Sequence, residues 1–516
     1  MRLNLRNGVA RVFFSSCFAL VILVFGLQPA FAEPAAVYPE KQFVLDWLSQ
    51  PEQFEKFGKL SDAIWSYAEL GLQEYRSSKL LADTLEKAGF NVERGLADMP
   101  TCIVGTYGSG KPVIGILAEY DALPMLSQEG RNPQQKPVVA GAPGHGCGHN
   151  MQAAAVAAAV ISIKEAMVKY GIKGTIKFFG SPAEETVISR PYMVKAGLFK
   201  DVDAVIDNHG DANFYSRYGV SGNGMFSTVF TFKGKTAHSG SMPWEGRSAL
   251  DAVELMNHAT NMLREHLFYT YRMHYVITDG GEAPNVVPDK ASVWYFVRNS
   301  DNLVEKDYEK VINAAKGAAL ATGTELAKVR VLTAIHQRYN NKAAAELFQS
   351  NIELVGMPKW TEEEHAFAKA LQKELGKKEE GFPAKVKEIA KPAVTFVGGG
   401  SSDVGEVSLV APLATIWFPG QVPGVINHHW STTASNYGSA AWKGLNAGAK
   451  AMAASAIDLM TKPTELKKLT DEFEETSKKN PFHSYLPDDA KPPLEMYEEL
   501  MGKYRPLMEK YYLSPE

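Results

Sequence analysis

The sequence has few cysteines and no excess of positive charge. Of its three cysteines, Cys17 lies in an apolar segment near the N-terminus, so only Cys102 and Cys147 remain for a folded domain, enough for one disulfide at most. The 54 Lys and Arg residues are outnumbered by 58 Asp and Glu residues, for a formal net charge of −4. A mildly acidic protein is a poor partner for nucleic acid, and we expect no such ligand.

The apolar run near the N-terminus is too short for a membrane span. It covers residues 13–27, whereas a spanning helix needs about 20 apolar residues. Three arginines precede it and Ala-Phe-Ala, ending at Ala32, follows it, which is typical of a secretory signal peptide. We expect residues 1–32 to be cleaved, leaving a periplasmic or secreted protein without a stable membrane span. Losing three arginines and no acid takes the formal charge from −4 to −7.

The chain is long enough for two or three domains. Its 516 residues exceed the roughly 100–200 residues of a typical domain. Between Phe43 and His209, helical and strand patterns alternate, which predicts an α/β domain with a mainly parallel sheet and helices on both faces. The predicted helices are residues 43–70, 77–88 and 151–170, and the predicted strands are residues 101–107, 113–118, 175–179 and 204–207.

Side chains that can bind a metal or a proton follow the predicted strands. Asp121 follows strand 113–118, Glu184 and Glu185 follow strand 175–179, and His209 follows strand 204–207. Ligands of open α/β sheets bind at the carboxyl ends of the strands, so these residues are candidates for one site. Two later apolar runs, 393–397 and 413–418, lead towards Asp403 and towards His428 and His429.

The segment from Gly144 to Asn150 sets Cys147 and His149 two residues apart among glycines, just before an alanine-rich helix. A thiol and an imidazole on such a turn indicate a transition metal. The ordinary alternatives are a Cys102–Cys147 disulfide, a solvated glutamate pair and isolated histidines with structural partners. With Glu185, His209 and one C-terminal histidine, the chain nevertheless has enough N, S and O ligands for two metal ions.

Such a site supports metal-assisted hydrolysis. Two metal ions lower the pKa of a water and polarise a carbonyl, while a nearby carboxylate takes the proton of the water. Of the adjacent Glu184 and Glu185, one can bind metal and the other can act as the base. Asp121, at a strand end, is well placed to orient a ligating histidine.

Four motifs occur in the order of a known family. They are Cys147 to Asn150, Ser181 to Glu185, Thr236 to Ser239 with Pro243 and Gly246, and Pro284 to Asp289. Together they resemble the co-catalytic metallopeptidase and amidohydrolase family, which includes carboxypeptidases, aminoacylases and auxin-conjugate hydrolases. The resemblance covers about residues 43–455.

The resemblance implies a role for each site residue. Glu184 is the general base, and Asp121 supports a ligating histidine. Two divalent ions, zinc or manganese, are implied, and their ligands are Cys147, His149, Glu185, His209 and His428. His428 is preferred to His429 because the family has a histidine two residues before a bulky position, here Trp430.

The resemblance also implies an inserted lid. We expect a smaller α+β, ferredoxin-like lid and dimerisation domain at residues 221–333, between catalytic segments 33–220 and 334–460, with a C-terminal extension at 461–516. In the lid, His238 is implied to reach the active site of a second copy and to stabilise the oxyanion. Asn285 and Arg298 are implied to hold the free carboxylate of the substrate. Segments 335–391 and 461–516 have no assigned role, although residues 496–512 are amphipathic and suit packing on the core or on a partner.

The expected function is that of an exported, metal-dependent amidohydrolase. It would hydrolyse the amide bond of small N-acyl or N-aroyl amino acids, or of dipeptides with a free carboxylate. A homodimer is expected, and the family also admits a second, different hydrolase chain as a partner. The alternative is a non-catalytic periplasmic binding or scaffold protein that retains the fold.

Overall fold

A computed structural model describes residues 37–392 and 399–515. The predicted signal peptide, residues 1–32, and the predicted strand at 393–397 lie outside the described residues, so both stay predictions. The predicted helix at 43–70 is wrong as a single element. It is divided into α1 (Pro39–Ser49) and α2 (Pro51–Tyr67), because Pro51 has no N–H to donate and is suited to the first turn of a new helix.

The α/β domain contains a seven-stranded sheet with the order β1-β2-β4-β3-β5-β13-β6. Its strands are β1 (Asn91–Arg94), β2 (Ile103–Ser109), β3 (Val113–Glu119), β4 (Gly174–Ser181), β5 (Ala204–Gly210), β6 (Tyr215–Arg217) and β13 (Leu413–Phe418). The four central strands are parallel to their central neighbours, whereas β1, β2 and β6 pair antiparallel at the edges. The α/β class is confirmed, but the sheet is mixed, since a short loop that joins β1 to β2 permits only antiparallel pairing.

Helices cover both faces of this sheet. All seven residues of β3 are buried, as expected for a parallel strand covered on both sides. On one face, Leu117, Phe179 and Val205 pack in a cluster with residues of α5 (Ser189–Lys195) and α10 (Val404–Ser408). Against the other face lie α4 (His149–Tyr170), α12 (Ser439–Thr461) and α8 (Lys342–Val355), with α1, α2 and α3 (Tyr75–Lys87) around them. Although α4 is long and apolar enough to span a membrane, 83% of its apolar window is buried, which is typical of a core helix.

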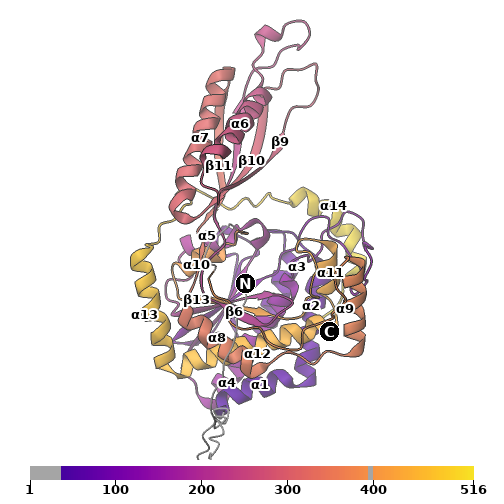
Figure 1. Cartoon of the computed structure of the whole chain (residues 1–516), viewed down its shortest axis with the longest axis vertical. Coiled ribbons are helices and arrows are strands. Elements are labelled where there is room, and N and C mark those ends of the chain that lie inside the picture. The colour runs from indigo at the N-terminus through magenta and orange to yellow at the C-terminus, as the bar shows by residue number, and fades with distance from the viewer. Residues whose placement is uncertain (1–36, 393–398, 516) are drawn as a thin grey trace, which may run out of the picture. The chain divides into compact units, whose positions relative to one another are not determined.

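The inserted region forms a second, four-stranded antiparallel sheet with the order β11-β8-β10-β9. In chain order its elements are β8 (Gly224–Lys233), α6 (Ala249–Leu263), β9 (Arg272–Asp279), β10 (Lys290–Asn299), α7 (Asp301–Thr322) and β11 (Glu325–Ile335). Figure 1 shows α6 and α7 side by side against this sheet. This βαββαβ arrangement is the predicted ferredoxin-like fold. A two-stranded ladder of β7 (Gly219–Ser221) and β12 (Arg338–Asn340) joins the segments that enter and leave it.

The C-terminal part completes the α/β domain. Its further helices are α9 (Glu362–Glu374), α11 (Trp430–Ser435), α13 (Pro463–Lys479) and α14 (Glu498–Met508). The amphipathic pattern at 496–512 becomes α14 and a short 3-10 turn, and it packs on the protein's own core. Met508 lies in a buried cluster with Ala68, Ala122 and Ala142, and Arg505 is 3.6 Å from the carboxylate of Glu69.

Candidate metal centre

The predicted ligands come from separate segments and meet at the carboxyl ends of the parallel strands. His209 lies in β5, Glu185 follows β4 and His428 precedes α11, while His149 is the first residue of α4. The potential ligand atoms of Cys147, His149 and His209 lie within 4.8 Å of one another, and so do those of Cys147, Glu185 and His428. Because Cys147 belongs to both groups, its sulfur can serve two metal ions.

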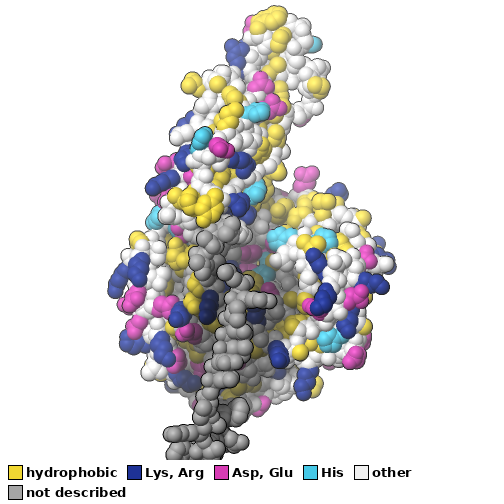
Figure 2. Space-filling view, viewed as in Figure 1, with side chains coloured by type: hydrophobic (Ala, Val, Ile, Leu, Met, Phe, Trp, Pro, Cys, Tyr) yellow, Lys and Arg dark blue, Asp and Glu magenta, His cyan; other side chains and the backbone are white. Residues whose placement is uncertain are grey.

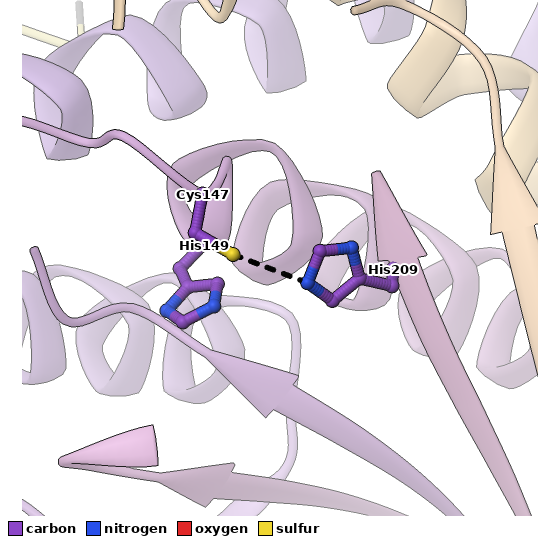
Figure 3. A group of neighbouring side chains, drawn as sticks. All are labelled: Cys147, His149 and His209. Carbon is purple, nitrogen blue, oxygen red and sulfur yellow. Dashed lines mark hydrogen bonds between the residues drawn. The ribbon is translucent and has the colours of Figure 1, made fainter. Parts of the chain in front are cut away.

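The Cys147 thiol faces the imidazole of His209 (Figure 3). Its Sγ is 3.3 Å from Nε2 of His209. The other ring nitrogen, Nδ1, is 2.8 Å from the carbonyl oxygen of Gly210, so Nδ1 carries the proton and Nε2 presents its lone pair to the group. Gly148 separates Cys147 from His149 and has a φ of 101°, a left-handed conformation that favours glycine and lets the loop turn into α4.

Asp121 orients two of the predicted ligands. Its Oδ1 is 2.8 Å from Nδ1 of His149, and its Oδ2 accepts the backbone N–H of Glu185 at 2.9 Å. A carboxylate on one ring nitrogen fixes the tautomer and leaves Nε2 free to bind metal. The predicted supporting role of Asp121 thus has a direct geometric basis.

The residues present fit a pair of divalent cations. Within the described parts of the chain, Nε2 of His149 and Oε1 of Glu185 are buried and have no hydrogen-bond partner. Buried polar atoms of this kind cost free energy unless a ligand satisfies them. The donors are one thiol, imidazoles and a carboxylate, a set that binds zinc and accepts manganese. Burial, together with Glu185, raises the pKa of the Cys147 thiol to about 12, and a cation would stabilise the thiolate instead.

Two alternatives from the sequence are resolved by the geometry. Cys102 and Cys147 are both free thiols, so they form no disulfide with each other. Nε2 of His428 is 3.2 Å from Oε2 of Glu185. By contrast, His429 caps α11, where its side chain accepts the backbone N–H of Ser431. His428 is therefore the histidine that lies with the other ligands.

A buried charge network that the sequence motifs did not reveal lies behind the ligands. The Arg190 side chain is fully buried and forms ion pairs with Glu119, at 2.7 Å, and with Asp403. Oε2 of Glu119 is 3.3 Å from Nε2 of His149. Burial opposes ionisation of Glu119, but Arg190 and the two nearby histidines lower its pKa to about 2. The network therefore keeps a negative charge beside the metal ligands. The sequence signals for it were the positions of Glu119 and Asp403 after apolar runs, whereas nothing in the sequence marked Arg190.

The ligands open into a cavity of about 670 Å³. Glu184 lines it, and Oε2 of Glu184 is 3.8 Å from Nε2 of His149. Arg298, on β10 of the inserted domain, lines the same cavity. The structure thus places the predicted base and one predicted carboxylate-binding residue in the same cavity as the candidate metal ligands.

His238 and Asn285 do not reach this cavity in their own chain. Neither is among the described residues that line it. The two lie together in the inserted domain, where the N–H of Ser239 donates to the carbonyl of Asn285 at 3.1 Å and His238 bridges to Val286. The His238 side chain is exposed.

Comparison with known proteins gives consistent matches. Residues 220–323 match the family model described as a peptidase dimerisation domain. The chain is 35% identical over 463 residues to one of the subunits of p-aminobenzoyl-glutamate hydrolase from Escherichia coli, covering 85% of this chain and 96% of that one. It is 28% identical to Xaa-Arg dipeptidase of Mus musculus, covering 82% and 90%. A dinuclear metal-binding peptidase of the M20 family from Bacillus subtilis shares the fold, with a TM-score of 0.51, 17% identity and coverage of 79% and 99%.

Proposed function

Because the chain belongs to the M20 family of peptidases and amidohydrolases, we propose that it hydrolyses the amide bond of N-acyl or N-aroyl amino acids with a free carboxylate. The observation that carries this proposal is that five potential metal ligands meet beside Glu184, and four of them line one cavity with it. Every ligand and the base that the family resemblance implies are present in this sequence. This favours an enzyme over a binding protein that merely retains the fold.

Two divalent ions held by Cys147, His149, Glu185, His209 and His428 would lower the pKa of the attacking water and polarise the scissile carbonyl. Glu184 lines the same cavity as the ligands, where it would take a proton from the attacking water and return one to the leaving amine. Asp121 holds His149 and the backbone of Glu185 in place. Cys147 favours zinc, while the imidazoles and the carboxylate accept either zinc or manganese.

The proposed assembly is a homodimer in which each inserted domain completes the site of the other copy. Figure 2 shows hydrophobic side chains exposed on the inserted domain. On its edge strand β9, Val276 and Ile277 are 56% and 47% exposed, and an apolar edge strand is prone to pair with another chain. In such a dimer the exposed His238 would donate to the oxyanion in the second copy. A second, different hydrolase chain is a further proposed partner, since the Escherichia coli relative is named as one of two subunits of its enzyme.

We also propose that the protein acts outside the cytoplasm after removal of residues 1–32. The support is the run of three arginines, an apolar stretch and Ala-Phe-Ala, the pattern of a cleavable export signal. N-terminal sequencing of protein recovered from the periplasm tests this, and a chain that still begins at Met1 in the cytoplasm would contradict it.

The function is tested by amine release from the purified chain 33–516, loaded with zinc or manganese. The substrates are p-aminobenzoyl-glutamate, other N-acyl amino acids and Xaa-Arg dipeptides. Hydrolysis that a chelator abolishes, and that Glu184→Gln lacks although it retains metal, would support the proposal. Metal-loaded protein that releases no amine from any substrate would contradict it.

A further inference from the structure

Besides the candidate metal ligands, the wall of the cavity carries several basic side chains. The basic side chains in its wall are those of Arg217, Arg298, His336, Arg338 and Lys391. Among the described residues that line it, the only acids are Glu184 and Glu185, the proposed base and a candidate metal ligand. A substrate in this cavity therefore lies near several basic groups. Those that lack a carboxylate partner in the protein indicate where the substrate is expected to have a negative charge.

Two of these basic groups are neutralised by the protein. Arg338 donates to Oδ2 of Asp207 at 3.0 Å and to Oγ of Ser402 at 2.9 Å. Nδ1 of His336 forms an ion pair with the buried carboxylate of Glu406. The positive charges of Arg338 and His336 are therefore balanced by carboxylates of the protein, and neither group needs an anionic ligand.

Lys391 is exposed to solvent, whereas Arg217 and Arg298 are partly buried. Within residues 37–392 and 399–515, neither guanidinium forms an ion pair with a carboxylate, and Nε of Arg298 is buried without any hydrogen bond. Burial lowers the pKa of Arg298, as expected for a cation withdrawn from water without an anion. Two partly buried guanidinium groups in one cavity are satisfied by two carboxylates.

The position of Arg217 is set by the edge strand β6 and by the indole of Trp417. It lies on β6, opposite Thr415 of β13, and its guanidinium carbon is 6.0 Å from the ring centre of Trp417. That ring is in turn 5.0 Å from the ring centre of His209. The guanidinium is therefore within about 11 Å of the imidazole of a metal ligand, with the indole as a rigid support. Arg298 approaches from the inserted domain, on β10.

We propose that Arg217 binds a carboxylate on the side chain of the amino acid whose amide is cleaved, while Arg298 binds its α-carboxylate. This rests on the proposed hydrolase function and specifies its substrates as N-acyl or N-aroyl derivatives of glutamate or aspartate. Four single bonds of about 1.5 Å each let a glutamate carboxylate lie about 5 Å from the scissile nitrogen, and the guanidinium of Arg217 lies within about 11 Å of the His209 ring. An arginine or lysine side chain at the same place would face an unpaired guanidinium and be repelled.

The test compares p-aminobenzoyl-glutamate with p-aminobenzoyl-glutamine, which has the same shape without the second charge. With metal-loaded protein, we expect kcat/KM to favour the glutamate compound, and p-aminobenzoyl-arginine to be a poor substrate. Arg217→Gln should lower kcat/KM for the glutamate compound by roughly 10- to 100-fold, the usual effect of losing a hydrogen bond to a charged group. For the glutamine compound it should change less than about 3-fold, because no charge pair is lost.

Arg94→Gln is the matched control. Arg94 is an exposed guanidinium on β1, at the opposite edge of the same sheet from β6. Its loss should leave kcat/KM unchanged for both substrates. An equal fold-loss of kcat/KM for both substrates in Arg217→Gln would overturn the inference. Wild-type protein that cleaves the glutamine compound as well as the glutamate compound would overturn it while leaving the hydrolase function intact.

A binding measurement separates this inference from the proposed function. Calorimetry with metal-loaded protein should show tighter binding of free glutamate than of free glutamine, with the difference lost in Arg217→Gln. If no substrate is cleaved, the proposed function fails, and this difference in binding still decides whether Arg217 recognises a second carboxylate. Equal binding of the two amino acids would reject that role.

Discussion

Oε1 of Glu74 accepts the backbone N–H of Ala183 at 2.8 Å, one residue before Glu184. Glu74 is fully buried, and its Oε2 accepts the hydroxyl of Thr101 at 2.8 Å. Ala183 and Val187 flank the glutamate pair, and both have a φ of 54°, a left-handed conformation that costs about 1 kcal/mol or more in residues other than glycine. The turn that aims Glu184 and Glu185 is thus strained, and Glu74 is one of the groups that hold it.

We predict that Glu74→Ala lowers kcat by about 100-fold, because the predicted base is displaced when the turn relaxes. Glu74→Gln keeps an acceptor for the Ala183 N–H and should restore most of this loss, with KM little changed in either variant. Glu69→Ala is the control, since Glu69 is equally buried but accepts from Arg76 and Ser77 and not from Ala183. Steady-state kinetics and metal content measure the effect, and similar losses in Glu69→Ala would show general destabilisation instead.

Metal stoichiometry should depend on which ligand is removed. Cys147 belongs to two ligand groups, whereas His428 belongs to one. We expect His428→Ala to retain about one metal ion per chain and Cys147→Ala to retain less than one, since a shared thiolate supports both ions. Elemental analysis after dialysis measures this. Cys102→Ala removes a buried thiol outside both groups and should leave the metal content unchanged. Equal metal contents in the His428 and Cys147 variants would exclude a shared sulfur.

Stability should fall with rising pH because of Asp62. Burial raises the pKa of Asp62 to about 7, although the N–H of Gly438 donates to it at 3.3 Å. The unfolded chain ionises this group near pH 4, so the folded state loses stability progressively from about pH 4 to pH 7 and no further above. Asp62→Asn should raise the free energy of unfolding by about 1–3 kcal/mol at pH 8 and by little near pH 4. Urea unfolding at the two pH values tests this, and a benefit confined to low pH would contradict it.

The candidate ligands could be predicted from the sequence because each follows an apolar strand or lies in a glycine-rich loop. Parallel strands place their carboxyl ends at one edge of the sheet, so the strand pattern alone predicts that Asp121, Glu185 and His209 lie together. The groups that position them were not predictable in this way. Glu74 and Arg190 act through contacts across 109 and 71 residues of sequence, and charged residues are ordinarily expected to be exposed.

The antiparallel edges of the sheet could not be predicted for a related reason. The residue pattern indicates a strand at 101–107, but its direction relative to β4 depends on pairing across the fold and not on its own residues. The break between α1 and α2 is marked by Pro51, yet the apolar pattern continues across it. Sequence patterns therefore located the elements and the reactive groups, while directions and buried supports required the tertiary structure.

The role of His238 can be decided by mixing two inactive variants. His238→Ala and Glu184→Gln should each lower kcat by at least about 100-fold, since one removes the oxyanion donor and the other the base. If His238 acts on the second copy, a mixed dimer contains one site with an intact Glu184 and an intact His238. Random exchange of subunits should then restore about one quarter of wild-type activity. Charge introduced on the exposed edge by Val276→Lys should reduce both dimer formation and this recovery, as size-exclusion chromatography and kinetics would show. Mixtures that stay inactive although subunits exchange would place His238 outside the reaction of the second copy.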